Sequence, residues 1–148
     1  MAIGLGNLLL TDEGVGVHVI ARLSERAARF PQADLVDAGT AGPAVLHLIA
    51  GRRKAVLVDC ACMARPPGDI RRFTPDEVRS VKALAGSSLH QGDLLQTLEL
   101  SRRLGECPAT VVVFGIQPAC VEPGAELSPA LAARLDEYAE LMAAELKD

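Results

Sequence analysis

Short apolar runs alternate with amphipathic segments from one end of the chain to the other. Ala55–Asp59 and Thr110–Ile116 are uninterrupted apolar runs, which predicts strands buried on both faces of a sheet. Ala2–Gly4 and Asp34–Asp37 predict two shorter strands, and Ile70–Phe73 predicts a strand at the edge of the sheet.

Between the strands, apolar residues recur at the three- and four-residue spacing of helices. This spacing predicts helices at Gly14–Ala28, Pro43–Ala50, Gln91–Leu104 and Ser128–Leu146. The last segment is expected to be one long helix, with one side formed by Leu131, Leu135, Tyr138, Leu141 and Met142.

This alternation of strands and helices predicts an α/β fold. We expect a three-layer α/β/α domain around a mostly parallel, twisted sheet, with at most one antiparallel edge strand and right-handed crossovers. The length of 148 residues suits a single domain, 1–148. In such sheets, ligands bind at the carboxyl ends of the strands, so the polar residues that follow each strand are the candidates for function.

Composition removes two classes of function. Lys and Arg number 15 against 19 Asp and Glu, for a net charge of −4, and the aromatic residues are three Phe, one Tyr and no Trp. A nucleic-acid partner is therefore not expected, because there is neither a basic stripe nor a set of stacking side chains. No apolar run approaches the roughly 20 residues that a membrane-spanning helix needs.

The ends of the chain and its cysteines predict the compartment. The N-terminal residues lack the charged region and the cleavage site of a signal peptide, so we expect a cytoplasmic protein. Four cysteines are present in a spacing that fits neither a zinc knuckle nor a disulfide framework: Cys60, Cys62, Cys107 and Cys120. Reduced, buried, structural thiols are the expectation for them.

Three carboxylates and one imidazole follow predicted strands or begin predicted helices: Glu13, Asp37, Asp59 and His90. Taken singly, each has a structural explanation, as a residue at a helix start or as an acceptor for backbone N–H groups in the next loop. If the fold brings them to one edge of the sheet, they form an oxygen and nitrogen site suited to Ni²⁺, Zn²⁺ or Mn²⁺.

The glycine-rich turn after the first strand does not fit dinucleotide binding. Gly4 and Gly6 supply two glycines of a G-x-G-x-x-G pattern, but Leu9 stands at the third. Asp12 and Glu13 then follow near the expected helix start, where carboxylates would repel a phosphate. A nucleotide-binding module is therefore the least favoured of three interpretations of the chain.

The stretch Gly4–Val17 closely resembles the opening signature of the nickel-iron hydrogenase maturation endopeptidases. The resemblance continues through Asp37–Gly42, Val58-Asp59 and Ser88–Gln91, and ends with a late block of Gly115–Pro118, Glu122-Pro123 and Leu127-Ser128. These segments occur in order over nearly the whole chain.

The resemblance implies an endopeptidase that removes a C-terminal peptide from the nickel-loaded precursor of the hydrogenase large subunit. It implies metal ligands at Glu13, Asp59 and His90, and a further functional carboxylate at Asp37. The nickel would be supplied by the precursor, although the free protein could hold another divalent ion. The implied partner is that precursor, met in the cytoplasm, and we expect the enzyme to be a monomer.

Two departures from the family pattern bear on the structure. Only Met1, Ala2 and Ile3 precede the glycine turn, so the first strand is expected to be short. Ala38 stands where the family commonly has glycine, and it would be strained if that position required a positive φ angle. Cys60 and Cys62 match no family motif, and we interpret them as packing thiols rather than as ligands.

Several mechanisms remain open at this stage. The ion could orient the scissile peptide, polarise its carbonyl or activate water, and Asp37 could position water or hydrogen-bond a ligand. No H-E-x-x-H zinc-protease motif is present, and a Cys60–His90 thiol pair has no support in the spacing. The alternative function is a non-catalytic protein that binds the nickel-loaded precursor during hydrogenase assembly.

Overall fold

The computed structural model describes residues 1–77 and 91–147. Its five strands are β1 (Ala2–Leu5), β2 (Leu35–Gly39), β3 (Lys54–Cys60), β4 (Ile70–Phe73) and β5 (Thr110–Ile116). Its described α-helices are α1 (Val15–Ser24), α2 (Val45–Ile49), α4 (Gln91–Arg103), α5 (Pro129–Ala132) and α6 (Leu135–Leu146). No described helix is both long enough and apolar enough to cross a membrane.

The strands form one sheet in the order β2-β1-β3-β5-β4. β1 runs parallel to both β2 and β3, and β3 runs parallel to β5 over seven residue pairs. β4 pairs antiparallel with β5 at the edge of the sheet. The predicted fold class, a mostly parallel sheet with one antiparallel edge strand, is confirmed. The short strand β1 is fully buried between its two neighbours.

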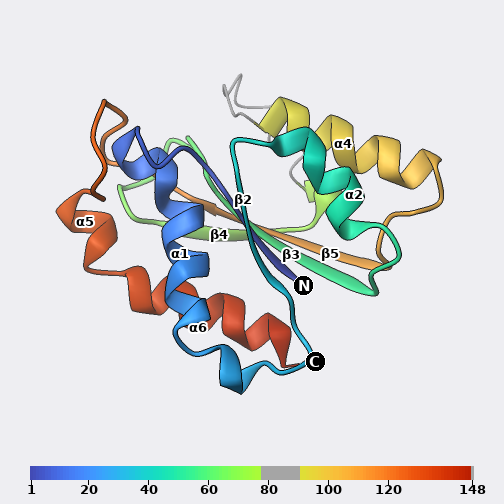
Figure 1. The fold of residues 1–148 in the computed structure, drawn as a ribbon. Coiled ribbons are helices and arrows are strands. Elements are labelled where there is room, and N and C mark those ends of the chain that lie inside the picture. The colour runs from blue at the N-terminus through green and yellow to red at the C-terminus, as the bar shows by residue number, and fades with distance from the viewer. Residues whose placement is uncertain (78–90, 148) are drawn as a thin grey trace.

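Helices cover both faces of the sheet (Figure 1). On one face, α1 and α6 pack over a core that includes Val19, Val56 and Tyr138. On the other face, α2 and α4 pack over a second core that includes Ile49, Leu57 and Leu98. β3 supplies alternate residues to the two cores, which explains why its sequence is continuously apolar.

Glycine allows α1 to pack directly on the sheet. A side chain on Gly16 would overlap the carbonyl oxygens of Leu5 and Val58, so the helix backbone lies against the ends of β1 and β3. Gly6 takes a φ of +138°, and a side chain there would overlap the carbonyl oxygen of Glu13. The glycines of the opening segment therefore serve close packing.

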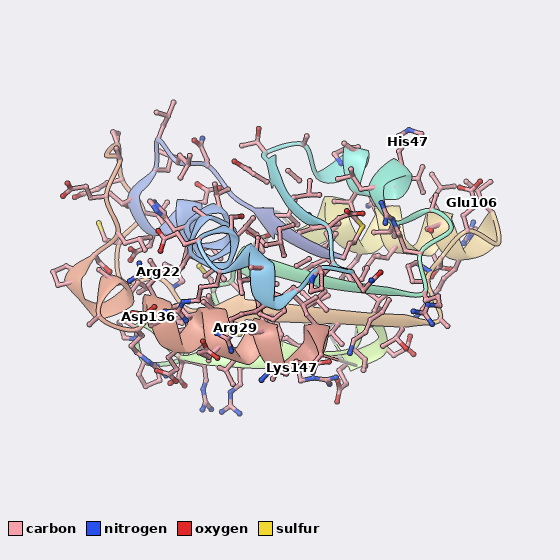
Figure 2. All side chains as sticks on the ribbon, turned by 60° about the horizontal axis from the view of Figure 1, so that its bottom comes forward. Arg22, Arg29, His47, Glu106, Asp136 and Lys147 are labelled. Carbon is pink, nitrogen blue, oxygen red and sulfur yellow. The ribbon has the colours of Figure 1, made fainter. Side chains whose placement is uncertain are left out.

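Ion pairs join the first and last helical segments along their exposed sides. Arg22, Arg26 and Arg29 donate hydrogen bonds of 2.6 to 3.3 Å to Asp136 and Glu140 of α6. Figure 2 shows Arg22 and Arg29 beside α6, on which Asp136 lies. Exposed pairs contribute little individually, and this network adds to the packing of two helices whose apolar faces share a core.

Three of the predicted helices differ from the observed ones. The single helix predicted over Ser128–Leu146 is wrong, because the chain forms α5, turns at Ala133 and Arg134, and continues as α6. At the turn, Arg134 and Tyr138 both donate to the carbonyl oxygen of Gly68 at 2.6 Å. Leu141 is also exposed rather than buried.

The helix predicted over Gly14–Ala28 is shorter than expected. It is preceded by a 3₁₀ turn at Thr11–Gly14 and ends at Ser24, and Ala27–Arg29 form a separate 3₁₀ turn. The predicted helix at Pro43–Ala50 is also divided, into a 3₁₀ turn at Gly42–Ala44 and the short α2.

Candidate functional site

A cavity of about 140 Å³ lies at the carboxyl ends of the central strands. The connection after β1 leads to β2 on one side, and the chain then returns past β1 to β3 on the other side, so the cavity occupies the point where the topology reverses. The residues that line it are Leu5, Gly6, Asn7, Leu10, Glu13, Gly39, Thr40, Gly42, Asp59 and Leu94.

Glu13 reaches this cavity from the 3₁₀ turn that precedes α1. Its N–H donates to the carbonyl oxygen of Leu10 at 3.0 Å, and its carbonyl lies against Gly6. The residue is 7% exposed. A carboxylate buried to this extent is costly unless a cation or hydrogen-bond donors meet it. Glu13 is a functional candidate because it lies in the cavity wall.

Asp59 enters the same cavity from the end of β3. It is 5% exposed, and one of its carboxylate oxygens accepts a hydrogen bond from the N–H of Cys60 at 2.8 Å. Glu13 and Asp59 are 46 positions apart in the sequence, yet both line one cavity. The prediction that the fold brings these two carboxylates to one edge of the sheet is confirmed.

Asp37 does not line the cavity but supports the loop that does. Its side chain is exposed, and one carboxylate oxygen accepts a hydrogen bond from the N–H of Gly39 at 2.8 Å. This contact shapes the turn that places Gly39, Thr40 and Gly42 in the cavity wall. The structural explanation for Asp37 is thus observed, and its chemical role remains a prediction.

Ala38 is not strained by this turn. Among the described non-glycine residues, positive φ angles occur at Thr11 and Ala64, whereas Ala38 has none. Gly39 takes the left-handed conformation instead, with a φ of +50°. The alanine is therefore a neutral departure from the family pattern.

His90, the third predicted ligand, lies outside the described residues. Within residues 1–77 and 91–147, no three His, Cys, Asp or Glu side chains are grouped so that they could hold a metal ion. Of the other histidines, His47 is exposed on α2 (Figure 2). His18 is half-buried, and its Nε2 has no hydrogen-bond partner among the described residues.

Asp12, which precedes Glu13 in the same 3₁₀ turn, has a structural role. It is fully buried, and it accepts hydrogen bonds from the N–H groups of Ala119, Cys120 and Ser128 and from the Ser128 hydroxyl, at 2.7 to 3.0 Å. Burial by itself would raise the pKa of Asp12, but these hydrogen bonds outweigh burial and lower the pKa below its ordinary value.

A second contact joins the same two segments beside Asp12. Thr11 has a φ of +41°, and its hydroxyl donates to the carbonyl oxygen of Cys120 at 2.8 Å while it accepts from the N–H of Glu122 at 3.1 Å. These hydrogen bonds compensate for an unfavourable backbone conformation. The Asp12 and Thr11 contacts attach the loop 117–128 to the turn that carries Glu13. This attachment could not be predicted from local sequence patterns, since more than 100 positions separate the partners.

The cysteines are all free thiols, as predicted, but not all are buried. Cys62 is exposed, whereas Cys60, Cys107 and Cys120 are half-buried. Burial, together with the negative charge of Asp59, raises the pKa of the Cys60 thiol far above its ordinary value. A thiol that stays protonated is a poor nucleophile, so Cys60 is unsuited to a thiol-protease role.

Sequence comparison relates the chain to one family of proteases. The family model described as HycI, hydrogenase maturation protease, matches residues 17–145. The hydrogenase expression/formation protein HoxM of Cupriavidus necator is 33% identical over 95% of this chain, and the hydrogenase 2 maturation protease of Escherichia coli is 30% identical over the whole chain. The chain spans 70% and 90% of the lengths of these two relatives, but 64% and 65% of the HupD proteins of Thiocapsa roseopersicina and Rhodobacter capsulatus.

Solved structures show the same architecture. The hydrogenase maturating endopeptidase HybD from E. coli superposes with a TM-score of 0.85 at 30% identity, over 99% of this chain and 90% of that one. The HybD protease from Thermococcus kodakarensis has a TM-score of 0.79 at 22% identity, which shows the shared fold. The chain, with its paired acidic residues in a cavity at the carboxyl ends of β1 and β3, belongs to the hydrogenase maturation protease family.

Proposed function

We propose that this chain is an endopeptidase that removes a C-terminal peptide from the nickel-loaded precursor of a nickel-iron hydrogenase large subunit. The observation that carries the proposal is the pairing of Glu13 and Asp59, both more than nine-tenths buried, in one cavity. Membership of the maturation protease family supports the peptidase activity and the kind of precursor.

In this proposal the two carboxylates are ligands to the nickel ion that the precursor carries, and His90 is the third. Carboxylate oxygen and imidazole nitrogen both suit a divalent transition ion, and an incomplete set of protein ligands leaves positions for groups of the precursor. The ion supplies polarisation or orientation of the scissile peptide when it is present. A precursor without nickel would offer nothing for the carboxylates to hold, so the enzyme would process only loaded substrate.

The residues of this chain position the two ligands and limit access of water. Gly6 and Leu10 hold the backbone of Glu13 close to the end of β1, and the N–H of Cys60 orients one oxygen of Asp59. Leu5, Leu10 and Leu94 form the apolar part of the cavity wall. Asp37 holds the loop that contains Gly39, Thr40 and Gly42 through its hydrogen bond with Gly39, and its exposed position suits a contact with substrate.

The test is a cleavage assay with purified protein and purified precursor, with the masses of both products determined. Loaded precursor should be shortened without any additional factor, and nickel-free precursor should stay intact. Equal cleavage of the two precursors would contradict recognition through nickel. Binding of loaded precursor without cleavage would instead support the alternative, a non-catalytic assembly protein.

Variants of the two carboxylates test their role directly. Glu13→Gln and Asp59→Asn retain size while removing the charge, so each should reduce cleavage of loaded precursor by roughly 100-fold or more. Asp76→Asn, which changes an exposed carboxylate paired with Arg102 far from the cavity, is the matched control and should cleave normally. Unchanged cleavage by both site variants would remove them from the mechanism.

A further inference from the structure

The turn that leads into the cavity displays two leucines to solvent. Leu8 is 41% exposed and Leu9 is 73% exposed, although each belongs to the opening segment whose neighbours form the cavity wall. Exposed apolar side chains beside a site are typical of surfaces that bind a partner.

This turn is held rigidly by hydrogen bonds. The N–H of Leu9 donates to the side chain of Asn7 at 2.9 Å, and the N–H of Leu10 donates to the Asn7 carbonyl oxygen at 3.1 Å. The two leucines are therefore presented in a fixed conformation, which reduces the entropy that a partner must remove on binding.

The loop 117–128 lies alongside the turn and extends the same surface. Gly124 donates to the carbonyl oxygen of Leu9 at 2.9 Å and accepts from the N–H of Thr11 at 2.8 Å, and Figure 1 shows the two segments side by side. Val121 in this loop is 51% exposed. We call Leu8, Leu9 and Val121, with the exposed Glu122 and Glu126 of the same loop, the recognition rim.

The described segments beside the rim carry charge of one sign. The segments 5–14, 37–43 and 57–62, which contribute to the cavity wall, and the neighbouring loop 117–128 contain no Lys, Arg or His. Glu13 and Asp59 face the cavity, whereas Glu122 and Glu126 lie outside it and form no ion pair with any described residue. The carboxylates of the cavity suit a metal cation, whereas the exposed ones of the outer loop offer negative charge to a positively charged partner.

We infer that the recognition rim binds the part of the precursor next to the scissile bond, and that this part presents apolar side chains flanked by Lys or Arg. The inference rests on the proposed function and adds the chemistry by which the protein substrate is selected. The leucines and Val121 supply apolar contact area, and the two glutamates steer and orient the basic flank. Binding of nickel in the cavity distinguishes loaded from unloaded precursor, and binding at the rim distinguishes the correct polypeptide from others.

The test compares rim variants with exposed residues of the same type elsewhere. The variant Leu8→Ser/Leu9→Ser should raise KM for loaded precursor about tenfold or more and leave kcat within about twofold, since it removes binding area outside the cavity. Leu104→Ser, which changes a leucine that is 56% exposed near the end of α4, is the control and should behave as wild type. Thermal unfolding of all variants verifies that the exposed substitutions leave the fold intact.

The glutamates are tested through salt. Glu122→Gln/Glu126→Gln should lower kcat/KM severalfold at low ionic strength. It should also flatten the dependence of kcat/KM on salt, because the variant lacks the charges that salt screens in wild type. Glu106→Gln, at an exposed position after α4 (Figure 2), is the control.

Direct binding of loaded precursor separates failure of the inference from failure of the proposed function. If wild type cleaves and both rim variants match their controls, the rim inference is overturned and the protease function stands. If wild type binds through the rim but does not cleave, the inference stands and the protease function falls. If wild type does not bind loaded precursor at all, both are overturned.

Discussion

At the scale of single residues, the buried acids of this chain divide into two kinds. Asp12 is surrounded by donors from the loop 117–128, and the carboxylate is satisfied within the protein. Glu13, the next residue, instead lines the cavity together with Asp59. One peptide unit therefore separates a carboxylate that holds the loop 117–128 from one that lines the cavity.

Asp12→Asn should destabilise the protein, because an amide cannot accept all of the hydrogen bonds that both carboxylate oxygens accept. With several charge-assisted bonds weakened, we expect the free energy of unfolding at neutral pH to fall by about 2–4 kcal/mol. Urea unfolding measures the change. Asp76→Asn, at an exposed carboxylate, is the control and should unfold almost as wild type does; equal stability of the two variants would show that Asp12 does not hold the loop.

The pH dependence of the same variant follows from the direction of the pKa shift. The folded pKa of Asp12 is lowered, so the stability that it contributes is present above the unfolded pKa near 4 and is lost as the pH falls through the folded pKa. The difference between wild type and Asp12→Asn should therefore be largest at neutral pH and should shrink below about pH 4. A difference that grows in acid would contradict this assignment.

At the scale of elements, the sequence predicts what depends on local pattern and misses what depends on distant contacts. The continuous apolar runs of β3 and β5 identify buried parallel strands, and the edge position of β4 also agrees with prediction. The interruption between α5 and α6 contains neither Gly nor Pro. It accompanies the contacts of Arg134 and Tyr138 with Gly68, which no local pattern encodes.

The candidate site shows the same division. The carboxyl-end rule for parallel sheets predicts that Glu13 and Asp59 approach each other, because Glu13 lies in the connection that follows β1 and Asp59 lies near the end of β3. The same rule places Asp37 near this edge of the sheet. It does not predict that the side chain points outward, which the hydrogen bond from the Gly39 N–H determines. The attachment of loop 117–128 to Asp12 could not be predicted, since it joins backbone N–H groups that no residue type marks.

Gly16 provides a test of helix packing in which propensity and contact predict opposite signs. In an exposed helix, Gly→Ala stabilises by about 1 kcal/mol. Here Gly16→Ala should destabilise by at least about 2 kcal/mol, because the new methyl group would overlap carbonyl oxygens of β1 and β3. Chemical denaturation measures both this variant and Ala21→Gly, an exposed substitution in the same helix that should cost only about 1 kcal/mol. A stabilised Gly16→Ala protein would show that α1 does not rest on the strand ends.

At the scale of the whole molecule, the C-terminal helix α6 connects the apolar core to the loops that follow β3 and β5. Tyr138 is fully buried in the core beneath α1, and its hydroxyl donates to the carbonyl oxygen of Gly68 at 2.6 Å. Gly68 in turn donates to the carbonyl oxygen of Gln117, at the start of the loop that Asp12 holds. One side chain thus joins α6, the loop after β3 and the loop after β5.

Tyr138 also makes global unfolding directly observable at high pH, because it is the single tyrosine of a chain without tryptophan. Burial raises the pKa of Tyr138 to about 12. A raised folded pKa means that the stability contributed by the protonated hydroxyl is complete below the unfolded pKa near 10 and is lost as the pH rises toward 12.

Tyrosinate absorbance should therefore appear together with the loss of far-ultraviolet circular dichroism as the pH is raised. Tyr138→Phe removes the titrating group, so its stability should decline less steeply over the same pH range than that of wild type. If tyrosinate formed near pH 10 while the circular dichroism stayed native, the hydroxyl would be accessible to solvent, and the link between α6 and the two loops would not hold.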